Sequence, residues 1–580
     1  MNKIKLLAIG ILSIFAVACE LDNYPMDAIS PNTFFQTEND LKLYTNSFYN
    51  MLPSGEGVYN ERVDNIITND LADELRGTRI VPTSGGGWSW SDLRNINFFL
   101  VNSHKCADTK AVAQYNGVAR FFRAYFYFDM VKRFGDVPWY SKPLETSDEE
   151  FLTKPRDSRV MVMDSVLADI NFAIANLGTG KNVNGVTKWT ALALKSRIGL
   201  YEGTFRKYHT QFNLPDAEKF LNAAVSASEE LINSGVYRLY TDTPETAYQK
   251  LFSSLTANPT EVILARSFSD ELQVYHNLNY YTMTASYGRP GLEKKLVNSY
   301  LMRDGSRFTD IAGYDKMEFY DEVQNRDPRL SQTIRTPGYT RIGETAPLVQ
   351  EFGATVTGYQ LIKFVTERKW DTFGKAVNDM PIFRYAEVLL NLAEAKAELG
   401  TLTQADIDKT IKVIRDRIGM PNLNMQEANQ NPDPYQAEMY QRVAGGNKGV
   451  ILEIRRERRI ELVMETFRWD DIIRWKEGPL LTKQFKGMYF PGVGSYDMDR
   501  DGKIDVIIYE GTKPNVTNTQ LLKLGGDISL ENGAAGGNII INAQINKKFD
   551  ENKDYLYPIP INERQLNPNL TQNPGWVDGL

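Results

Sequence analysis

The segment at residues 117–140 constrains the fold most, because it reads as one helix with a very wide apolar surface. A helix of this kind must be covered by other elements on more than one side. The pattern therefore predicts a central core helix, and the alternative is an aromatic platform for a ligand. The apolar and aromatic side chains behind this prediction are Val118, Phe121, Phe122, Tyr125, Tyr127, Phe128, Met130, Val131 and Phe134.

The composition favours a large globular core and argues against several kinds of site. Of the 580 residues, 42% are hydrophobic and 24% are charged, which is an ordinary globular balance. The net charge of −7 argues against nucleic acid as a partner. The three histidines do not pair at metal-ligand spacing, and the two cysteines are Cys19 and Cys106. A zinc cluster or a disulfide framework is therefore not expected.

The N-terminus predicts a lipid-anchored, exported protein. Lys3 and Lys5 precede an apolar run at 6–17, which is too short to span a bilayer and is typical of a signal peptide. The run ends in AVAC, which resembles a bacterial lipobox and predicts cleavage after residue 18 and lipidation of Cys19. Residues 19–33 are then a tether. The alternative is an ordinary signal peptide with a chance cysteine.

Two pairs of predicted helices indicate the fold class. The first pair covers 187–201 and 216–234, and the second covers 384–399 and 404–418. Each pair has roughly the length of a tetratricopeptide unit. We expect a mainly α fold, in which a tetratricopeptide-like scaffold of helical pairs carries long irregular loops and a few short strands.

The remaining segments divide between a helical frame and loop-rich parts. The frame is expected at about 34–235 and 380–478, and the loop-rich parts at about 236–379 and 479–554. We expect all of them to form one domain over 34–580. Long ordered loops carry function more often than the frame that holds them.

Local signals set several boundaries within this plan. Asp216 is expected to cap the helix that follows it, and Thr403 with Asp406 resembles a capping box. The run at 261–266 reads as a strand, and the Gly-rich stretch at 495–552 is expected to be irregular.

A late helix at 451–466 carries a ridge of acidic residues. Glu453, Glu457, Glu461 and Glu465 follow one another at helical spacing, and such like charges repel unless other elements supply partners. We expect arginine partners that hold these carboxylates ionised. The alternative is a catalytic carboxylate pair, which needs a raised pKa on one member. The candidate partners are Arg384, Arg415, Arg417, Arg468 and Arg474.

An acidic run at 497–505 is a candidate calcium loop. Oxygen ligands at alternate positions and a glycine for the sharp turn suit a hard cation. Ile508 stands where an EF-hand-like loop needs its bidentate Glu, so a solvated acidic turn is an equal alternative. Any metal would be structural Ca²⁺. The candidate residues are Asp497, Asp499, Asp501, Lys503 and Asp505.

Motifs along nearly the whole chain resemble the SusD/RagB family of outer-membrane lipoproteins. The segment at 117–140 is one of them, and the others occur in the family's order: NRDPRL at 325–330, DMPIFRYAEVLLNLAEA at 379–395, RRIELVME at 458–465, RWDDIIRW at 468–475, YLYPIP at 555–560 and QNPGW at 572–576. The resemblance implies a tetratricopeptide-like scaffold. It also implies that the protein captures oligosaccharides at the cell surface and forms a lid over a SusC-like TonB-dependent transporter.

A sugar ligand needs aromatic faces beside planar polar groups, because pyranose faces are apolar and their hydroxyls are not. Residue type and loop context, not family motifs, select the candidates. Each single aromatic is more often loop packing, but the group is the best candidate for a binding face. The candidate residues are Asp73, Arg76, Trp88, Trp90, Tyr280, Tyr281, Tyr287, Arg368 and Trp370.

Two other classes of function remain open from the sequence. A surface lipoprotein glycosidase is compatible with the many acidic residues, although no catalytic constellation is visible, so no enzyme activity is expected. A structural tetratricopeptide adaptor, or a binder of peptides, is the other alternative.

Overall fold

The structure is a computed structural model, and it describes residues 34–54, 61 and 63–577. The predicted signal peptide, the lipidated Cys19 and the tether lie outside the described residues and stay predictions. Within the described ranges, no helix is both long enough and apolar enough to cross a membrane.

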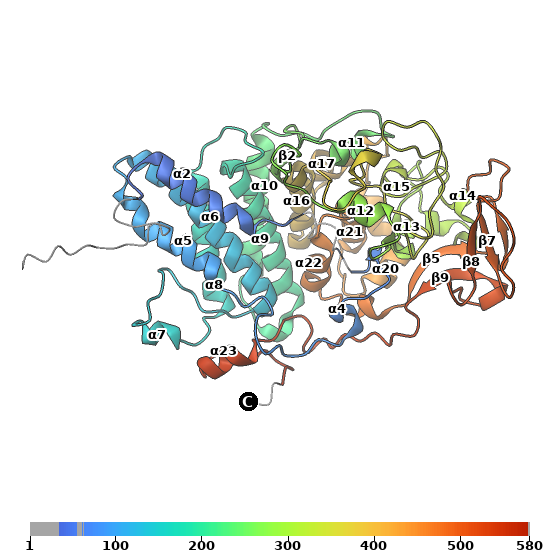
Figure 1. The fold of residues 1–580 in the computed structure, drawn as a ribbon. Helices are drawn as coiled ribbons and strands as arrows, with labels where there is room; N and C mark the ends of the chain where they lie inside the picture. The colour runs from blue at the N-terminus through green and yellow to red at the C-terminus, as the bar shows by residue number, and fades with distance from the viewer. Residues whose placement is uncertain (1–33, 55–60, 62, 578–580) are drawn as a thin grey trace, which may run out of the picture.

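The long helices gather in one half of the molecule, and most of the short strands and long loops lie in the other half (Figure 1). Helix α9 packs against α10, α6 against α8, and α10 against α16. The fold is therefore mainly α with neighbouring helices in pairs, as the sequence predicts. The helices of this half are α2 (Glu38–Asn46), α5 (Ser91–Asn102), α6 (Thr109–Phe134), α8 (Arg159–Asn176), α9 (Lys188–Tyr208), α10 (Ala217–Asn233) and α16 (Tyr385–Leu399).

Helix α6 supplies much of the core of this half. It begins at Thr109, where the Asp108 carboxylate accepts two backbone N–H bonds, so the predicted start at Gly117 is wrong. Gly117 lies inside the helix, where a Cβ would come 3.1 Å from Leu177 beyond the end of α8. The predicted burial is confirmed, because these side chains are fully enclosed: Phe121, Phe122, Tyr127, Val131 and Phe134.

Glycines allow α9 and α10 to approach closely. A Cβ on Gly199 would lie 2.6 Å from the backbone oxygen of Phe220. Helix α9 also continues beyond the predicted end at residue 201. The predicted cap at Asp216 is wrong: this residue has a left-handed φ of 61° and makes no side-chain capping bond to the described start of α10. A capping residue needs extended backbone angles, which Asp216 lacks.

The second predicted pair is α16 followed by a helix that is broken in two. The capping box of Thr403 and Asp406 is confirmed at the start of α17 (Gln404–Lys409). The backbone of Thr410 leaves the helical region, and α18 (Ile411–Arg417) starts after it. Two short helices then occupy the polar segment: α19 (Met425–Gln430) and α20 (Pro434–Met439).

The predicted loop-rich part between the pairs contains many short elements. Strand β2 (Val262–Arg266) confirms the predicted strand, and it pairs antiparallel with β4 (Met380–Arg384). The N-terminal strand β1 (Ile66–Ile67) pairs with β3 (Gly291–Leu292). The short helices are α4 (Asp73–Arg76) and α7 (Glu149–Leu152) in the N-terminal part, then α11 (Ala247–Ser253), α12 (Leu278–Met283), α13 (Lys294–Ser299), α14 (Phe319–Glu322) and α15 (Pro328–Thr333).

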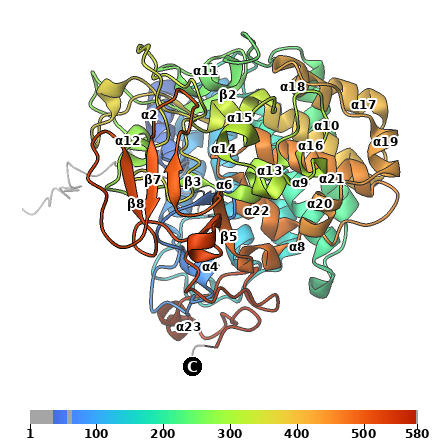
Figure 2. The ribbon, with the colours of Figure 1, turned by 90° about the vertical axis from the view of Figure 1, so that its right-hand side faces the viewer.

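The described C-terminal part adds three helices and two small sheets. The expectation of an irregular segment at 495–552 is only partly right, because it holds strands of both sheets. One sheet joins β6, β7 and β8 at an edge of the molecule (Figure 2), and the other pairs β5 with β9. The elements are α21 (Lys448–Glu461), α22 (Phe467–Arg474), β5 (Phe485–Phe490), β6 (Gly494–Tyr496), β7 (Val506–Tyr509), β8 (Gln520–Lys523), β9 (Gly537–Ile541) and α23 (Ile561–Leu566).

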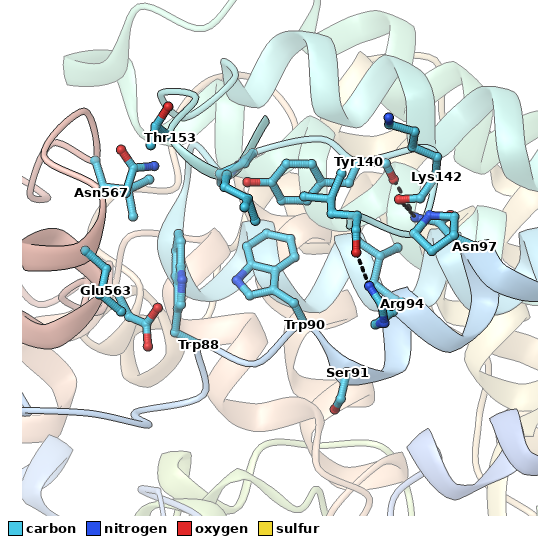
Figure 3. A pocket seen from close by; sticks show the side chains of 17 residues that line it. Trp88, Trp90, Ser91, Arg94, Asn97, Tyr140, Lys142, Thr153, Glu563 and Asn567 are labelled. Atoms are coloured by element: carbon cyan, nitrogen blue, oxygen red, sulfur yellow. Dashed lines mark hydrogen bonds between the residues drawn. The ribbon is translucent and has the colours of Figure 1, made fainter. Parts of the chain in front are cut away.

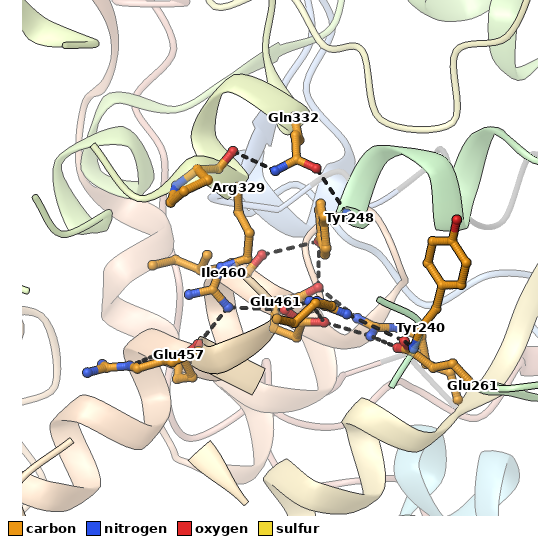
Figure 4. A network of polar contacts seen from close by, with 12 residues as sticks. Tyr240, Tyr248, Glu261, Arg329, Gln332, Glu457, Ile460 and Glu461 are labelled. Carbon is orange, nitrogen blue, oxygen red and sulfur yellow. Dashed lines mark hydrogen bonds and ion pairs between the residues drawn. The ribbon is translucent and has the colours of Figure 1, made fainter. Parts of the chain in front are cut away.

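The acidic ridge of α21 is buried and meets arginines from several elements (Figure 4). Glu461 pairs with Arg329 at 3.1 Å, with Arg384 at 2.7 Å and with Arg417 at 2.7 Å. Burial alone raises the pKa of Glu461, but these three guanidinium groups together hold it well below its ordinary value. The predicted partners Arg384 and Arg417 are confirmed for this residue, and Arg415 meets Glu457 at 2.9 Å. Arg468 and Arg474 instead pair with Asp64 and Glu394, which lie outside the ridge, so these two predicted partners are wrong. The network of Glu461 ties α15, β4 and α18 to α21.

Two buried acids depart from this pattern. Burial raises the pKa of Glu453 to about 7, because Arg415 and Arg307 only partly offset the loss of water. Burial also raises the pKa of Glu61 to about 7. An arginine partner is still present for Glu453, because Arg456 donates to both of its oxygens at 2.9 and 2.8 Å.

Candidate ligand-binding site

Helix α12 and two neighbouring loops present an aromatic surface. The Tyr287 ring is 39% exposed and stacks on the buried ring of Tyr281 at 4.1 Å and 20°. Phe373 is 59% exposed and meets the half-buried ring of Tyr280 edge-on at 5.3 Å. We name the surface formed by Tyr280, Tyr287, Trp370 and Phe373 the aromatic platform.

Buried polar groups hold the parts of the aromatic platform together. The side-chain amide of Asn279 on α12 donates to Thr366 at 3.0 Å and to Asp371 at 3.2 Å. Arg341 pairs with the same Asp371 at 2.6 Å. The loop that carries Trp370 and Phe373 is thereby fixed against α12, so its aromatic rings are positioned before any ligand arrives.

Planar charged pairs border the aromatic platform. Arg368 donates two hydrogen bonds to Glu344, at 2.7 and 2.9 Å, and this exposed pair lowers the pKa of Glu344. On the other side, the Asn69 N–H donates to the Gly288 carbonyl at 2.9 Å, next to Tyr287. Asp70 and Arg76 form an ion pair beyond this contact. Figures 1 and 2 show α4, which ends at Arg76, apart from α12.

Trp88 and Trp90 line a different hollow, a cleft of about 520 Å³ between α5, the loop after α6 and α23 (Figure 3). Trp88 is only 6% exposed and packs on Phe134 at 4.9 Å. The Trp90 ring meets Trp88 at 5.3 Å and Tyr140 at 5.4 Å. Trp90 is half-buried and both contacts are edge-on, so the cleft is a second candidate surface for stacking a sugar.

The structure thus divides the predicted site residues into two groups. Figure 1 shows α5 and α23 apart from α12, so the cleft and the platform are separate surfaces. Sequence reasoning missed Phe373 and Glu344. The sequence signal that could have identified Phe373 is its position shortly after Trp370 in the same loop. The platform group contains Tyr280, Tyr281, Tyr287, Arg368 and Trp370, and the cleft group contains Trp88 and Trp90. Asp73 and Arg76 lie on α4, which stands apart from α12, so the structure brings them to neither surface.

The acidic run forms the turn between β6 and β7. Carboxylate oxygens of Asp497, Asp499 and Asp501 lie within 4.8 Å of one another. Asp505 differs, because its carboxylate accepts a bond from the Met498 N–H at 2.7 Å, and Lys503 pairs with Asp501. Oxygen ligands suit Ca²⁺, but this ion usually takes six or more of them and the cluster supplies three. Calcium binding therefore stays a prediction.

The fold and its surfaces define a class: a scaffold of paired helices that presents an aromatic surface on its loops. Residues 260–576 match the model of the SusD family, and residues 81–192 match a model described as starch-binding and associating with the outer membrane. The first match covers more than half of the chain, and the chain belongs to the SusD family.

Two known relatives are similar over most of their own length. SusD-like protein P2 of Formosa agariphila is 23% identical over 99% of this chain and 100% of its own. SusD-like protein P38 of the same organism is 24% identical over 81% and 90%. Among solved structures, a SusD-like protein from Bacteroides fragilis has a TM-score of 0.68 at 21% identity, with 95% of this chain and 100% of its own covered. A SusD-like carbohydrate binding protein from the same species has a TM-score of 0.67 at 20% identity, with 93% and 100% covered.

Proposed function

We propose that this protein is a non-catalytic glycan-binding protein whose ligand lies across the aromatic platform. The observation that carries this proposal is the pair of exposed rings, Tyr287 and Phe373, beside planar charged groups such as Arg368 with Glu344. Pyranose faces stack on aromatic rings, and their hydroxyls bond to planar donors and acceptors at the edge.

The descriptions of relatives support a carbohydrate ligand. One structural relative is described as a carbohydrate binding protein, and the model that matches residues 81–192 is described as starch-binding. Starch is therefore the first glycan to test. The same model description supports a place at the outer membrane.

We also propose that lipidated Cys19 anchors the protein and that it delivers its glycan to a SusC-like TonB-dependent transporter. The lipobox-like sequence and the family resemblance support this arrangement. Cys19→Ala should shift the protein from the detergent phase to the aqueous phase, and unchanged partitioning contradicts the anchor. A tagged protein should co-purify its transporter from solubilised outer membranes, and its absence contradicts the partnership.

Affinity electrophoresis against a panel of polysaccharides that includes soluble starch tests the ligand class. We expect at least one glycan to retard the protein and no release of reducing ends on long incubation. Retardation by none contradicts glycan binding and favours a peptide-binding or structural adaptor. Turnover by the purified protein contradicts the non-catalytic part of the proposal.

Single substitutions then separate the platform from the cleft. Tyr287→Ala and Trp370→Ala should each weaken binding about tenfold, which corresponds to about 1.4 kcal/mol. Phe151→Ala is the matched control, because Phe151 is an exposed aromatic of α7, away from the platform. Loss of binding in Trp90→Ala, with normal binding in both platform variants, assigns the ligand to the cleft.

A further inference from the structure

Two adjoining hollows lie at the edge of the molecule opposite α12, around α18 and α19 (Figure 2). We name the first the charged pocket, a space of about 290 Å³ whose wall includes Arg307, Asp310, Arg415, Glu453 and Arg456. We name the second the amide groove, of about 820 Å³, lined by Gln404, Asn422, Asn424, Gln426, Asn429 and Gln430 together with Leu423 and Met425. The two share residues 422–424, so they are continuous.

Arg415 leaves one hydrogen-bond donor unused in the wall of the charged pocket. This residue is 3% exposed; its Nε donates to Glu457 at 2.9 Å and its Nη1 to the Pro421 carbonyl at 3.3 Å. Its buried Nη2 finds no hydrogen-bond partner among the described residues. The nearest carboxylate is that of Glu453, 3.9 Å away, which is beyond hydrogen-bonding distance.

Arg456 repeats this feature on the same wall. It is 2% exposed, and its Nη1 donates to both oxygens of Glu453 at 2.9 and 2.8 Å. Its buried Nε has no partner in the part of the chain that the structure describes. Buried donors are almost always satisfied, so two such groups beside one pocket indicate that something else bonds to them.

The charges of the pocket favour a neutral ligand. The three guanidinium groups of the wall face the carboxylates of Asp310, Glu427 and Glu453, so neither sign dominates. Burial raises the pKa of Glu453 to about 7, which makes this carboxylate a ready acceptor that another negative group would oppose. A vicinal diol fits the pair: one hydroxyl accepts from Arg415 Nη2, and its neighbour donates to Glu453.

The amide groove continues the same chemistry. The side-chain oxygen of Asn424 accepts the Glu427 N–H at 3.1 Å, and that of Asn429 accepts the Val450 N–H at 2.8 Å. The side-chain oxygen of Gln404 accepts the Met425 N–H at 2.9 Å. These bonds fix the amides in place. The NH₂ group of Gln404 already donates to Asp408 at 3.0 Å and to the Leu423 carbonyl at 2.9 Å. Among the described residues, the NH₂ groups of Asn424 and Asn429 stay available as neutral donors, which suits hydroxyl-rich ligands.

We propose that the charged pocket and the amide groove form a second carbohydrate-binding site. It takes the end of a neutral oligosaccharide, with a vicinal diol between Arg415 and Glu453 and further sugar units along the amides. Its lining contains no aromatic residue, so binding there depends on hydrogen bonds and not on stacking. The proposal does not depend on the aromatic platform.

Titration of the full-length protein with neutral oligosaccharides tests the second site. The probes are maltoheptaose, cellohexaose, xylohexaose and mannohexaose, with oligogalacturonate as the anionic comparison. In the Tyr287→Ala/Trp370→Ala background, which removes the platform, we expect one neutral probe to keep saturable binding. In this same background, either the pair Gln426→Ala/Gln430→Ala or the single substitution Glu453→Gln should weaken that binding at least tenfold. The amide control Gln324→Ala, on an exposed glutamine beyond α14, should leave it unchanged.

Each outcome decides the proposal. Binding that is unchanged by both groove variants, no binding of any neutral probe in the platform-deficient background, or tighter binding of oligogalacturonate overturns it. A crystal soaked with the bound probe should show two sugar hydroxyls at Arg415 and Glu453, and water alone there overturns it. If the platform variants bind as the wild type does while the groove variants do not, the platform proposal fails and this one stands.

Discussion

At the scale of single residues, the buried ion pairs of α21 are the most consequential feature. Glu461 pairs with three buried arginines, so its negative charge helps to compensate their positive charges. Sequence reasoning predicted that arginines would meet the acidic ridge, because like charges at helical spacing demand partners. It could not predict that burial would raise the pKa of Glu453, because that depends on which elements pack beside it.

Glu461→Gln should destabilise the fold strongly, because it removes a carboxylate that three buried guanidinium groups share. We expect a loss of about 3–5 kcal/mol in the free energy of unfolding, measured by urea denaturation. The exposed residue Glu438 provides the matched control. Glu438→Gln should lower the free energy of unfolding by less than about 0.5 kcal/mol. Equal effects of the two substitutions contradict the compensating role of Glu461.

Glu61 should make stability depend on pH. Burial raises its folded pKa from 4.5 to about 7, so between these values the folded state binds more protons than the unfolded state. The contribution of Glu61 to stability is therefore largest at low pH and falls as pH rises from about 4.5 to 7, by at most about 1.4 kcal/mol per pH unit. Unfolding of Glu61→Gln across this range should lack that slope. A parallel pH profile for the variant and the wild type refutes the assignment.

At the scale of elements, helix boundaries were predictable where periodicity and capping signals agreed. They were less predictable where contacts with neighbouring segments set the backbone conformation. The capping box of Thr403 and Asp406 begins α17 as expected. The break at Thr410 and the left-handed Asp216 were not predictable, because both depend on how neighbouring segments pack. The start of α6 was misplaced because Gly117 looks like a helix boundary, although it serves close packing against Leu177.

Gly199→Ala should separate α9 from α10. Its added methyl group would lie 2.6 Å from backbone atoms of Phe220 and Ala224, which cannot move aside as a side chain can. We expect a loss of about 1–3 kcal/mol in unfolding free energy. Gly446→Ala is the control, because a Cβ there meets nothing within 4 Å. Equal stability of the two variants contradicts the close approach.

The β6–β7 turn should bind calcium if its three clustered carboxylates act together. Calcium added to chelator-treated protein should raise the melting temperature, and Asp497→Asn should abolish the rise. Asn569→Asp adds an exposed carboxylate elsewhere and should leave the response intact. No heat of binding in calorimetry and no change in melting temperature rule out the site and leave a solvated acidic turn.

At the scale of the whole molecule, the sequence was enough for the fold class and the family but not for the shape of the site. Motifs and helical pairing are local signals, and they led to a mainly α scaffold. The nine predicted ligand residues came from one criterion, yet the chain places Trp88 and Trp90 in a cleft and the tyrosines on the platform. Phe373 completes the platform only through tertiary contact with Tyr280.

The central claim is that the aromatic platform holds the glycan. Isothermal titration of the Tyr287→Ala/Trp370→Ala protein, with the polysaccharide that retards the wild type, tests it most directly. The account predicts that the strongest binding phase disappears or weakens at least tenfold, while melting temperature and Phe151→Ala binding stay as in the wild type. Undiminished affinity in the double variant contradicts the claim.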